Sequence, residues 1–202
     1  MALRDVYVDQ VRLLLRLLPI VAREDCFALK GGTAINLFER DLPRLSVDID
    51  LMYLPLHDRP AALAGIDAAM TRIAAATEDT IPGARITPHR QEGAILRLLV
   101  RVASTQVKIE VSPVLRGVVG ATRLMGVSAA VEETFGFAET TLVSFEDLYA
   151  GKLMAALDRQ HPRDLFDVRD LLAREGVTVP LREAFIVYLL SQHRPMGEVL
   201  AA

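Results

Sequence analysis

Two aspartates separated by one residue, Asp48 and Asp50, are the side chains of this sequence best suited to hold a metal ion. They lie in residues 47–54, VDIDLMYL, whose alternation of apolar and polar residues predicts a strand. Side chains two positions apart on a strand share a face, so the two carboxylates would lie roughly 6.6 Å apart along the backbone. Such oxygen ligands suit Mg²⁺ or Mn²⁺, and two of these ions can stabilise both oxygens of a phosphoryl-type transfer.

A pair of glycines precedes the aspartates. Gly31, Gly32 and Thr33 belong to a predicted tight turn between a short buried strand (26–29) and a helix (34–40). Glycines let the backbone approach a phosphate closely, and the free N–H groups at the start of a helix attract an anion. The hydroxyl group of Thr33 could cap the helix or contact the phosphate.

A third carboxylate is available from Glu110, in the run QVKIEVSPV. On a strand, Glu110 shares its face with Lys108, while Arg97 and Arg101 share a face of the preceding strand. If this polar face lines the site, it joins a metal ligand to a basic track for a triphosphate or RNA. The alternative is a solvated face of a half-buried sheet.

The elements that must position these residues are a mixture of strands and helices. Residues 77–93 contain two prolines and two glycines, which predicts a loop with at most a short strand. Mixed turns and short elements are expected at 115–137, and Ser144-x-x-Asp147 resembles a capping box. Strands are predicted at 26–29, 47–54, 94–103, 106–114 and 139–143, and helices at 6–22, 34–40, 58–77, 145–158, 161–176 and 181–192. The pattern predicts an α+β fold with a mixed sheet in domain 1–143 and a helical C-terminal region, 144–202.

Composition limits the classes of protein and partner. The chain has 202 residues, of which 51% are hydrophobic, and a net charge of -3, so any nucleic-acid partner must use a local basic patch. Cys26 is the only cysteine, which excludes an intramolecular disulfide and a cysteine-rich zinc site, and the four histidines lack metal-ligand spacing. The apolar run before residue 23 is interrupted by Arg16 and is too short to span a bilayer. We therefore expect a cytoplasmic protein without a signal peptide or a membrane partner.

Four blocks of sequence together resemble one known family. LKGGTAINLFERDLPRLSVDIDL and VKIEVSP are followed in order by SFEDLYAGKLMAAL and HPRDLFDVRDLL. They are similar to the AbiEii/AbiGii toxin family of polymerase-β-like nucleotidyltransferases, which is related to the MenT toxins that modify transfer RNA. The blocks cover most of residues 28–55 and 106–172, and the resemblance implies the polymerase-β-like fold.

The resemblance also implies roles for individual residues near the aspartates. Gly31, Gly32 and Thr33 would hold the triphosphate of an NTP, and Arg44 and Ser46 would position their loop or contact phosphate. The implied metal ligands are the three carboxylates named above, Asp48, Asp50 and Glu110.

In the C-terminal blocks, the resemblance implies that Lys152 neutralises nucleotide phosphates as a point charge. Asp164 and Asp167 would complete the catalytic set by orienting Lys152 or the acceptor. The chain reads Arg163-Asp164-x-x-Asp167, one residue shorter than the family's Arg-Asp-x-x-x-Asp-like pattern. From the residues alone, a mid-helix lysine is more often solvated than functional.

The implied reaction is the transfer of a nucleoside monophosphate from an NTP to an acceptor hydroxyl group, with Mg²⁺ or Mn²⁺ as cofactor. We expect transfer RNA (tRNA) as the acceptor, and a toxin that works in a toxin–antitoxin or abortive-infection phage-defence system with a cognate antitoxin as partner. The alternatives are a protein or small-molecule acceptor, and an NTP-binding protein of this fold without catalytic activity.

Overall fold

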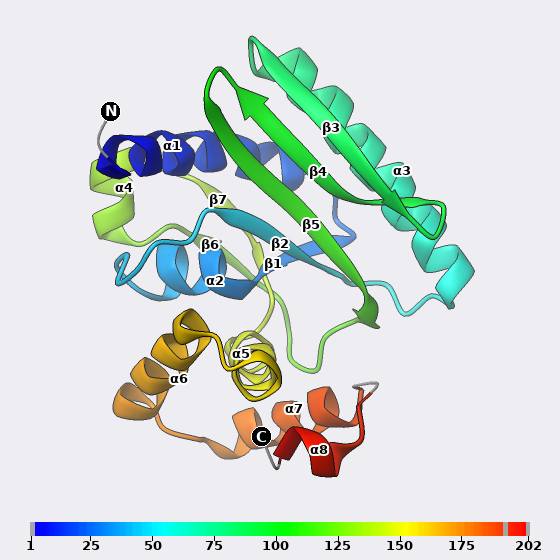
Figure 1. Cartoon of the computed structure of the whole chain (residues 1–202), viewed down its shortest axis with the longest axis vertical. Coiled ribbons are helices and arrows are strands. Elements are labelled where there is room, and N and C mark those ends of the chain that lie inside the picture. The colour runs from blue at the N-terminus through cyan, green and yellow to red at the C-terminus, as the bar shows by residue number, and fades with distance from the viewer. Residues whose placement is uncertain (1–2, 192–193, 201–202) are drawn as a thin grey trace. The chain divides into compact units, whose positions relative to one another are not determined.

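The computed structural model of the chain describes residues 3–191 and 194–200, which form two compact units (Figure 1). Unit 1 comprises Met1–Gly117 and Arg123–Leu142, and unit 2 comprises Val118–Thr122 and Val143–Ala202. Unit 1 contains the mixed sheet, and unit 2 is helical apart from its short first segment. The fold is therefore α+β, as the sequence predicts.

The sheet of unit 1 has seven strands in the order β3-β4-β5-β2-β1-β7-β6. Strand β2 runs parallel to β5 and β1 runs parallel to β7, while the other neighbours are antiparallel. The strands are β1 Phe27–Lys30, β2 Asp48–Tyr53, β3 Ala84–Gln91, β4 Ala94–Val102, β5 Thr105–Arg116, β6 Arg123–Gly126 and β7 Glu139–Leu142. The strands predicted around residues 26–29, 47–54, 94–103, 106–114 and 139–143 are confirmed.

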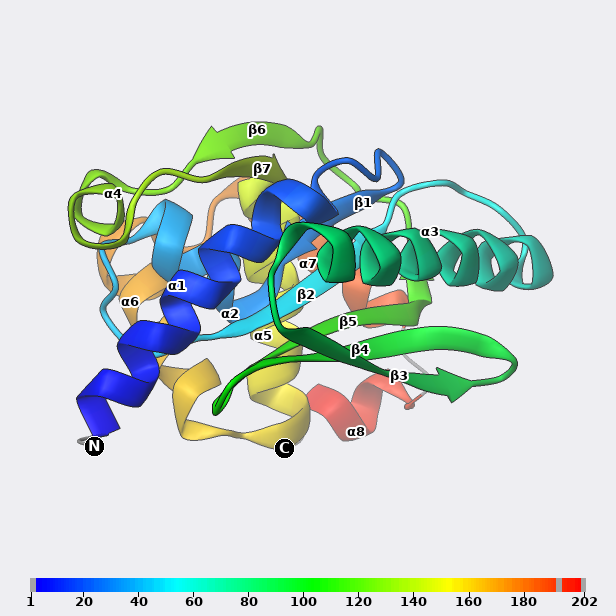
Figure 2. The same cartoon turned by 90° about the horizontal axis from the view of Figure 1, so that it is seen from above.

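Two long helices, α1 (Leu3–Val21) and α3 (Arg59–Thr80), lie along one face of this sheet (Figure 2). In α1, Leu14, Leu17 and Leu18 are fully buried, and their spacing of three and four residues places them on one side of the helix. Burial of these leucines against the sheet stabilises unit 1 by about 1.5–3 kcal/mol per side chain. A shorter helix, α4 (Ala129–Phe135), lies between β6 and β7 in the chain.

The chain turns directly from β1 into a helix at the glycine pair. The helix α2 (Gly31–Ala34) continues as a π-helix, η1 (Ile35–Glu39), so helical structure begins at Gly31. The separate tight turn predicted at residues 30–33 is therefore wrong. Gly31 has φ of +77°, a conformation that side chains with a Cβ rarely adopt, and this lets the chain change direction within one residue.

Strand β3 corrects the loop predicted at residues 77–93. It pairs with β4 along its whole length and forms one edge of the sheet. Most of its side chains are exposed, so it lacks the apolar alternation by which strands are recognised. Pro88 is tolerated because an edge strand has one side on which a missing N–H loses no ladder hydrogen bond.

The helices of unit 2 are α5 (Phe145–Arg159), α6 (Pro162–Arg174), α7 (Val179–Leu190) and α8 (Met196–Leu200), and α5 packs against the other three. The Ser144 hydroxyl oxygen accepts a hydrogen bond of 2.9 Å from the Asp147 backbone N–H, so the cap predicted at the start of α5 is present. The sequence did not predict α8. None of the helices in the described part of the chain is long and apolar enough to span a membrane.

Candidate functional site

Three carboxylates lie on one face of two adjacent strands in unit 1. Asp48 and Asp50 alternate along β2 with Ile49, which is fully buried on the opposite face. On the neighbouring strand β5, Glu110 is the register partner of Asp50. The parallel pairing of β2 and β5 thus brings Glu110 beside the two aspartates, although about sixty residues separate them in sequence.

Two basic side chains contact these carboxylates. The Lys108 ammonium group lies 2.7 Å from Glu110 Oε2 and 3.4 Å from Asp48 Oδ2. From β4, the Arg97 guanidinium group lies 2.7 Å from Glu110 Oε1. Partial burial alone would raise the pKa of Glu110, but the hydrogen bonds from Lys108 and Arg97 outweigh it and hold the pKa below its usual value.

Lys30 faces Asp50 from the other side. It ends β1 and is the register partner of Asp50, so these two side chains share the sheet face of Glu110. Burial raises the pKa of Asp50 despite the nearby Lys108 and Lys30, and burial lowers the pKa of Lys30 despite Asp50 and Glu110. The sequence alone does not indicate a role for Lys30, because the residue that faces it is set by strand pairing.

The glycine pair is fitted closely against the carboxylate strand. A Cβ atom at Gly31 would lie 2.6 Å from Asp50 Oδ2, which is too close for any non-bonded pair. The buried Thr33 hydroxyl group donates a hydrogen bond to the backbone carbonyl of Asp48. The start of α2 is therefore held directly beside both aspartates.

The loop between η1 and β2 brings Arg44 and Ser46 next to Gly32. A Cβ atom at Gly32 would lie 2.6 Å from Ser46 Oγ and 2.8 Å from an Arg44 guanidinium nitrogen. Asn36, which is fully buried, fastens this loop: its amide donates a 2.7 Å hydrogen bond to the Gly32 carbonyl and accepts one of 3.3 Å from the Arg44 backbone N–H. Asn36 was missed from the sequence, because its partners are backbone groups that no pattern reveals.

Unit 2 contains a second charged cluster, formed by the C-terminal residues that the sequence singled out. The Lys152 ammonium group on α5 lies 2.7 Å from Asp164 Oδ1 and 3.1 Å from Asp167 Oδ2 on α6. Arg159, a residue the sequence analysis did not select, donates to the other oxygen of Asp164 at 2.7 Å. Lys152 is only 6% exposed, so its charge is offset inside the protein by the two aspartates.

The donors of unit 1 suit a hard divalent cation. Asp48, Asp50 and Glu110 provide only oxygen, and two of them already hold a cationic group, the Lys108 ammonium. Within residues 3–191 and 194–200, no three acidic, histidine or cysteine side chains are grouped so that they could hold a metal ion by themselves. Mg²⁺ does not need one, because it usually keeps several waters and binds one or two carboxylates plus substrate phosphates.

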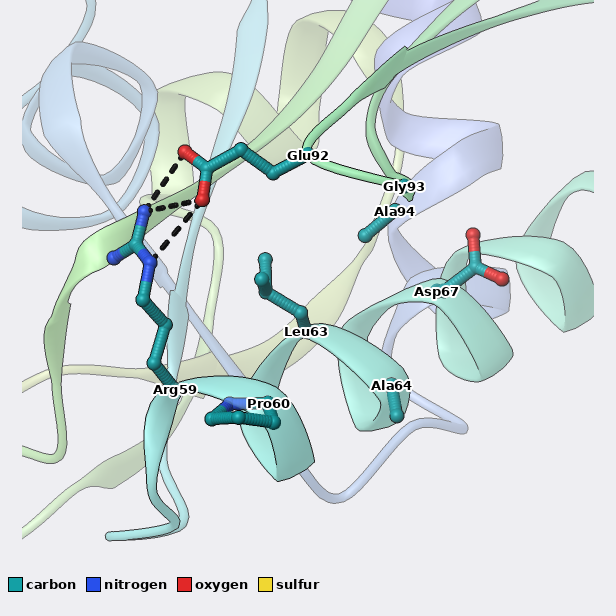
Figure 3. A pocket seen from close by; sticks show the side chains of 8 residues that line it. All are labelled: Arg59, Pro60, Leu63, Ala64, Asp67, Glu92, Gly93 and Ala94. Carbon is teal, nitrogen blue, oxygen red and sulfur yellow. Dashed lines mark hydrogen bonds and ion pairs between the residues drawn. The ribbon is translucent and has the colours of Figure 1, made fainter.

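A separate pocket of about 590 Å³ lies between the start of α3 and the β3–β4 turn (Figure 3). Its charged groups are already paired: Arg59 forms hydrogen bonds of 2.7–3.1 Å with Glu92, and Asp67 accepts from the Arg90 side chain and the Ile95 backbone N–H. The charged side chains that line this pocket are therefore engaged with one another or with the backbone.

Comparison with protein families shows to which family the chain belongs. Residues 12–201 match the family described as nucleotidyl transferase AbiEii toxin, type IV TA (toxin–antitoxin) system. The chain belongs to the AbiEii family. The match spans nearly the whole chain, including both the carboxylate strands and the C-terminal cluster. No curated protein matches this AbiEii chain in sequence.

Two solved structures are similar to this AbiEii protein. MenT4, a nucleotidyltransferase toxin from Mycobacterium tuberculosis, is similar over 91% of this chain with a TM-score of 0.64 and 20% identity. The chain spans 63% of the length of MenT4. The antibiotic-resistance factor ANT(2'')-Ia is similar over 90% of this chain and 92% of its own, at 17% identity and a TM-score of 0.48.

Proposed function

We propose that this AbiEii protein transfers a nucleoside monophosphate from an NTP to an acceptor hydroxyl group and releases pyrophosphate. The observation that carries the proposal is the register of Asp50 with Glu110 on adjacent strands, with Asp48 on the same face and the glycine pair beside it. A nucleotide-binding protein without catalysis has no need for three neighbouring carboxylates next to a phosphate-binding turn.

The residues of unit 1 would have different roles in this reaction. Gly31 and Gly32 let the start of α2 lie directly against Asp50, Ser46 and Arg44, where its free N–H groups would bind the triphosphate. Thr33 fixes the start of this helix to the strand of the aspartates. Arg44 and Ser46, held over Gly32, would contact phosphate oxygens.

Asp48, Asp50 and Glu110 would hold Mg²⁺ or Mn²⁺. When bound, these ions would favour ionisation of the acceptor hydroxyl group and offset the charge of the leaving pyrophosphate. The protein itself would contribute positioning and charge, with no covalent intermediate.

The cluster of unit 2 is proposed to serve the same reaction. The resemblance assigns Lys152 to the nucleotide phosphates and makes Asp164 and Asp167 its orienting partners. Their contacts of 2.7 and 3.1 Å with the ammonium group support the orienting role. Replacement of Lys152 by arginine should keep the charge but not this geometry, so transfer should fall while folding is largely retained.

We propose tRNA as the acceptor, and a type IV toxin–antitoxin system, with a cognate antitoxin, as the setting. The test is incubation of the full chain with each α-labelled NTP, Mg²⁺ and total tRNA, beside an Asp48→Asn variant. Label in RNA that is lost in the variant supports the reaction and the acceptor.

Other results of this test would change the proposal. Label in a protein or a small molecule would replace tRNA as acceptor while keeping the reaction. Metal-dependent NTP binding without transfer to any acceptor would overturn the enzymatic proposal in favour of a binding protein.

A further inference from the structure

We propose that the β3–β4 hairpin binds phosphates of the RNA acceptor through Arg85 and Arg101. This proposal rests on the proposed function, because it assigns the acceptor a binding surface. The pair of residues is called the arginine row below. It lies on the same sheet face as the three carboxylates, and half of it belongs to a strand that the sequence did not predict.

The strand register places the row on the site's face. Glu110 is paired with Arg97, and Arg97 is paired with His89, so these three share one face of the sheet. Arg101 is four residues beyond Arg97 on the same strand and is paired directly with Arg85. Residues an even number of positions apart on a strand share a face, so Arg101 lies on the face of Arg97 and Glu110. Arg85, as the direct partner of Arg101, lies on this face too.

The composition of the hairpin is strongly basic. Strands β3 and β4 contain four arginines and one histidine, and neither contains an acidic residue. The net charge of the whole chain is -3, so the hairpin is a local exception to an acidic protein. An acidic protein that binds a polyanion requires such a patch.

The two arginines of the row face each other without an acidic partner in the described part of the chain. Both are exposed, and the Arg101 guanidinium group donates only to the neutral Gln106 side chain, at 3.0 Å. Like charges directly opposite on a sheet destabilise it. By contrast, Arg90, on the other face of β3, is paired with Asp67 at 3.0 Å.

The position of the arginine row favours binding of the RNA acceptor rather than binding of the NTP. Along β4, Arg101 lies roughly 13 Å from the level of Glu110, and β4 is roughly 10 Å across the sheet from β2. A triphosphate held at the start of α2, beyond β2, would therefore lie roughly 16 Å or more from the row. A nucleic-acid backbone is a longer anion that could reach the row while its acceptor end lies at the carboxylates.

The test compares two double variants of the full chain that remove the same charge. Arg85→Gln with Arg101→Gln removes the row. Arg12→Gln with Arg16→Gln removes two exposed arginines from α1, which covers the opposite face of the sheet. Binding of fluorescently labelled total tRNA is followed by anisotropy between about 50 and 200 mM salt. Binding of each NTP is measured without RNA.

Loss of the row should weaken tRNA binding by about tenfold and reduce the salt slope by about 1.4–1.8, because two phosphate contacts disappear. The α1 control should retain the wild-type slope, and both variants should bind NTP normally. Because the substitution removes a like-charge pair, the melting temperature of the row variant should not fall.

An unchanged slope, or equal losses in the two double variants, would overturn the proposal. Transfer by the wild-type chain to an acceptor other than RNA, without tRNA binding, would also overturn it while leaving nucleotidyl transfer intact. Row-dependent tRNA binding by a chain that transfers nothing would support the surface and contradict the proposed function.

Discussion

The ammonium group of Lys108 lies 2.7 Å from Glu110 Oε2, and the same nitrogen is 3.4 Å from Asp48 Oδ2. A positive charge of the protein thus lies between two of the proposed metal ligands. A divalent cation that binds both carboxylates must displace this ammonium group, because two positive charges at such short range repel each other. We therefore expect Lys108 to compete with the metal ion and, without a metal ion, to keep Glu110 and Asp48 in place.

Replacement of Lys108 by glutamine should tighten the binding of Mn²⁺ by about threefold to tenfold, which is the effect of a partly exposed charge pair worth roughly 1 kcal/mol. Electron paramagnetic resonance of free Mn²⁺ during a titration measures this without any need for activity. Arg16→Gln, which removes the same charge from α1, is the control and should bind Mn²⁺ as the wild type does. Equal or weaker binding by Lys108→Gln would show that the two cations do not compete.

Gly31→Ala should destabilise the protein and abolish transfer. The new Cβ would add strain at a φ of +77° and would lie 2.6 Å from Asp50 Oδ2, so the aspartate or the helix must move. Gly83→Ala is the matched control, because its φ is +75° and its Cβ would contact nothing within 4 Å.

Both glycine variants should lose about 1 kcal/mol to the backbone conformation, measured by urea unfolding. Only Gly31→Ala should lose more than this and also lose transfer. If the two variants behave alike, the close approach to Asp50 has no functional importance.

Only some of these contacts can be predicted from the sequence. The alternation in residues 47–54 predicts that both aspartates share a face, because that depends on local strand geometry alone. The strand pattern made Glu110 a candidate third carboxylate but left a solvated sheet face as the alternative, because the parallel pairing of β2 and β5 joins distant segments. Strand β3 could not be recognised, because it is exposed on both faces and contains Pro88. The pairing of Arg85 with Arg101 therefore appears only in the structure.

Lys152→Met should destabilise unit 2 by about 3–5 kcal/mol, because it removes the buried cation that contacts both carboxylates and leaves Arg159 to pair with Asp164. Chemical denaturation with helix content as the signal measures the change. The triple variant Lys152→Met, Asp164→Asn, Asp167→Asn removes all three charges of this contact and should recover much of the lost stability. A Lys152→Met protein as stable as the wild type would contradict the burial of the charge.

The ion pairs of Asp164 should make the stability of the protein depend on pH. Burial favours a raised pKa for Asp164, but hydrogen bonds from Arg159 and Lys152 outweigh it and hold the pKa below its usual value. The stabilisation is therefore complete above the unfolded pKa of about 3.9 and is lost as the pH falls through the lower folded value. Asp164→Asn should be less stable than the wild type at pH 6, and this difference should shrink as the pH is lowered toward 3. A difference that grows on acidification would reverse the assigned sign.

Asp50→Asn should change stability and transfer in opposite directions. Burial raises the pKa of Asp50, so its charged form costs stability above the folded pKa, and this cost disappears as the pH falls below the unfolded value. The variant should therefore be more stable than the wild type at pH 7.

The measurement is the single-turnover rate of transfer from an α-labelled NTP in Mg²⁺, made beside the melting temperature of the same sample. We predict a rate lowered by about a thousandfold or more, which corresponds to roughly 4 kcal/mol of lost transition-state stabilisation, together with a raised melting temperature. A stable Asp50→Asn protein that transfers nucleotide within tenfold of the wild-type rate would contradict the assignment of the carboxylates as the catalytic centre.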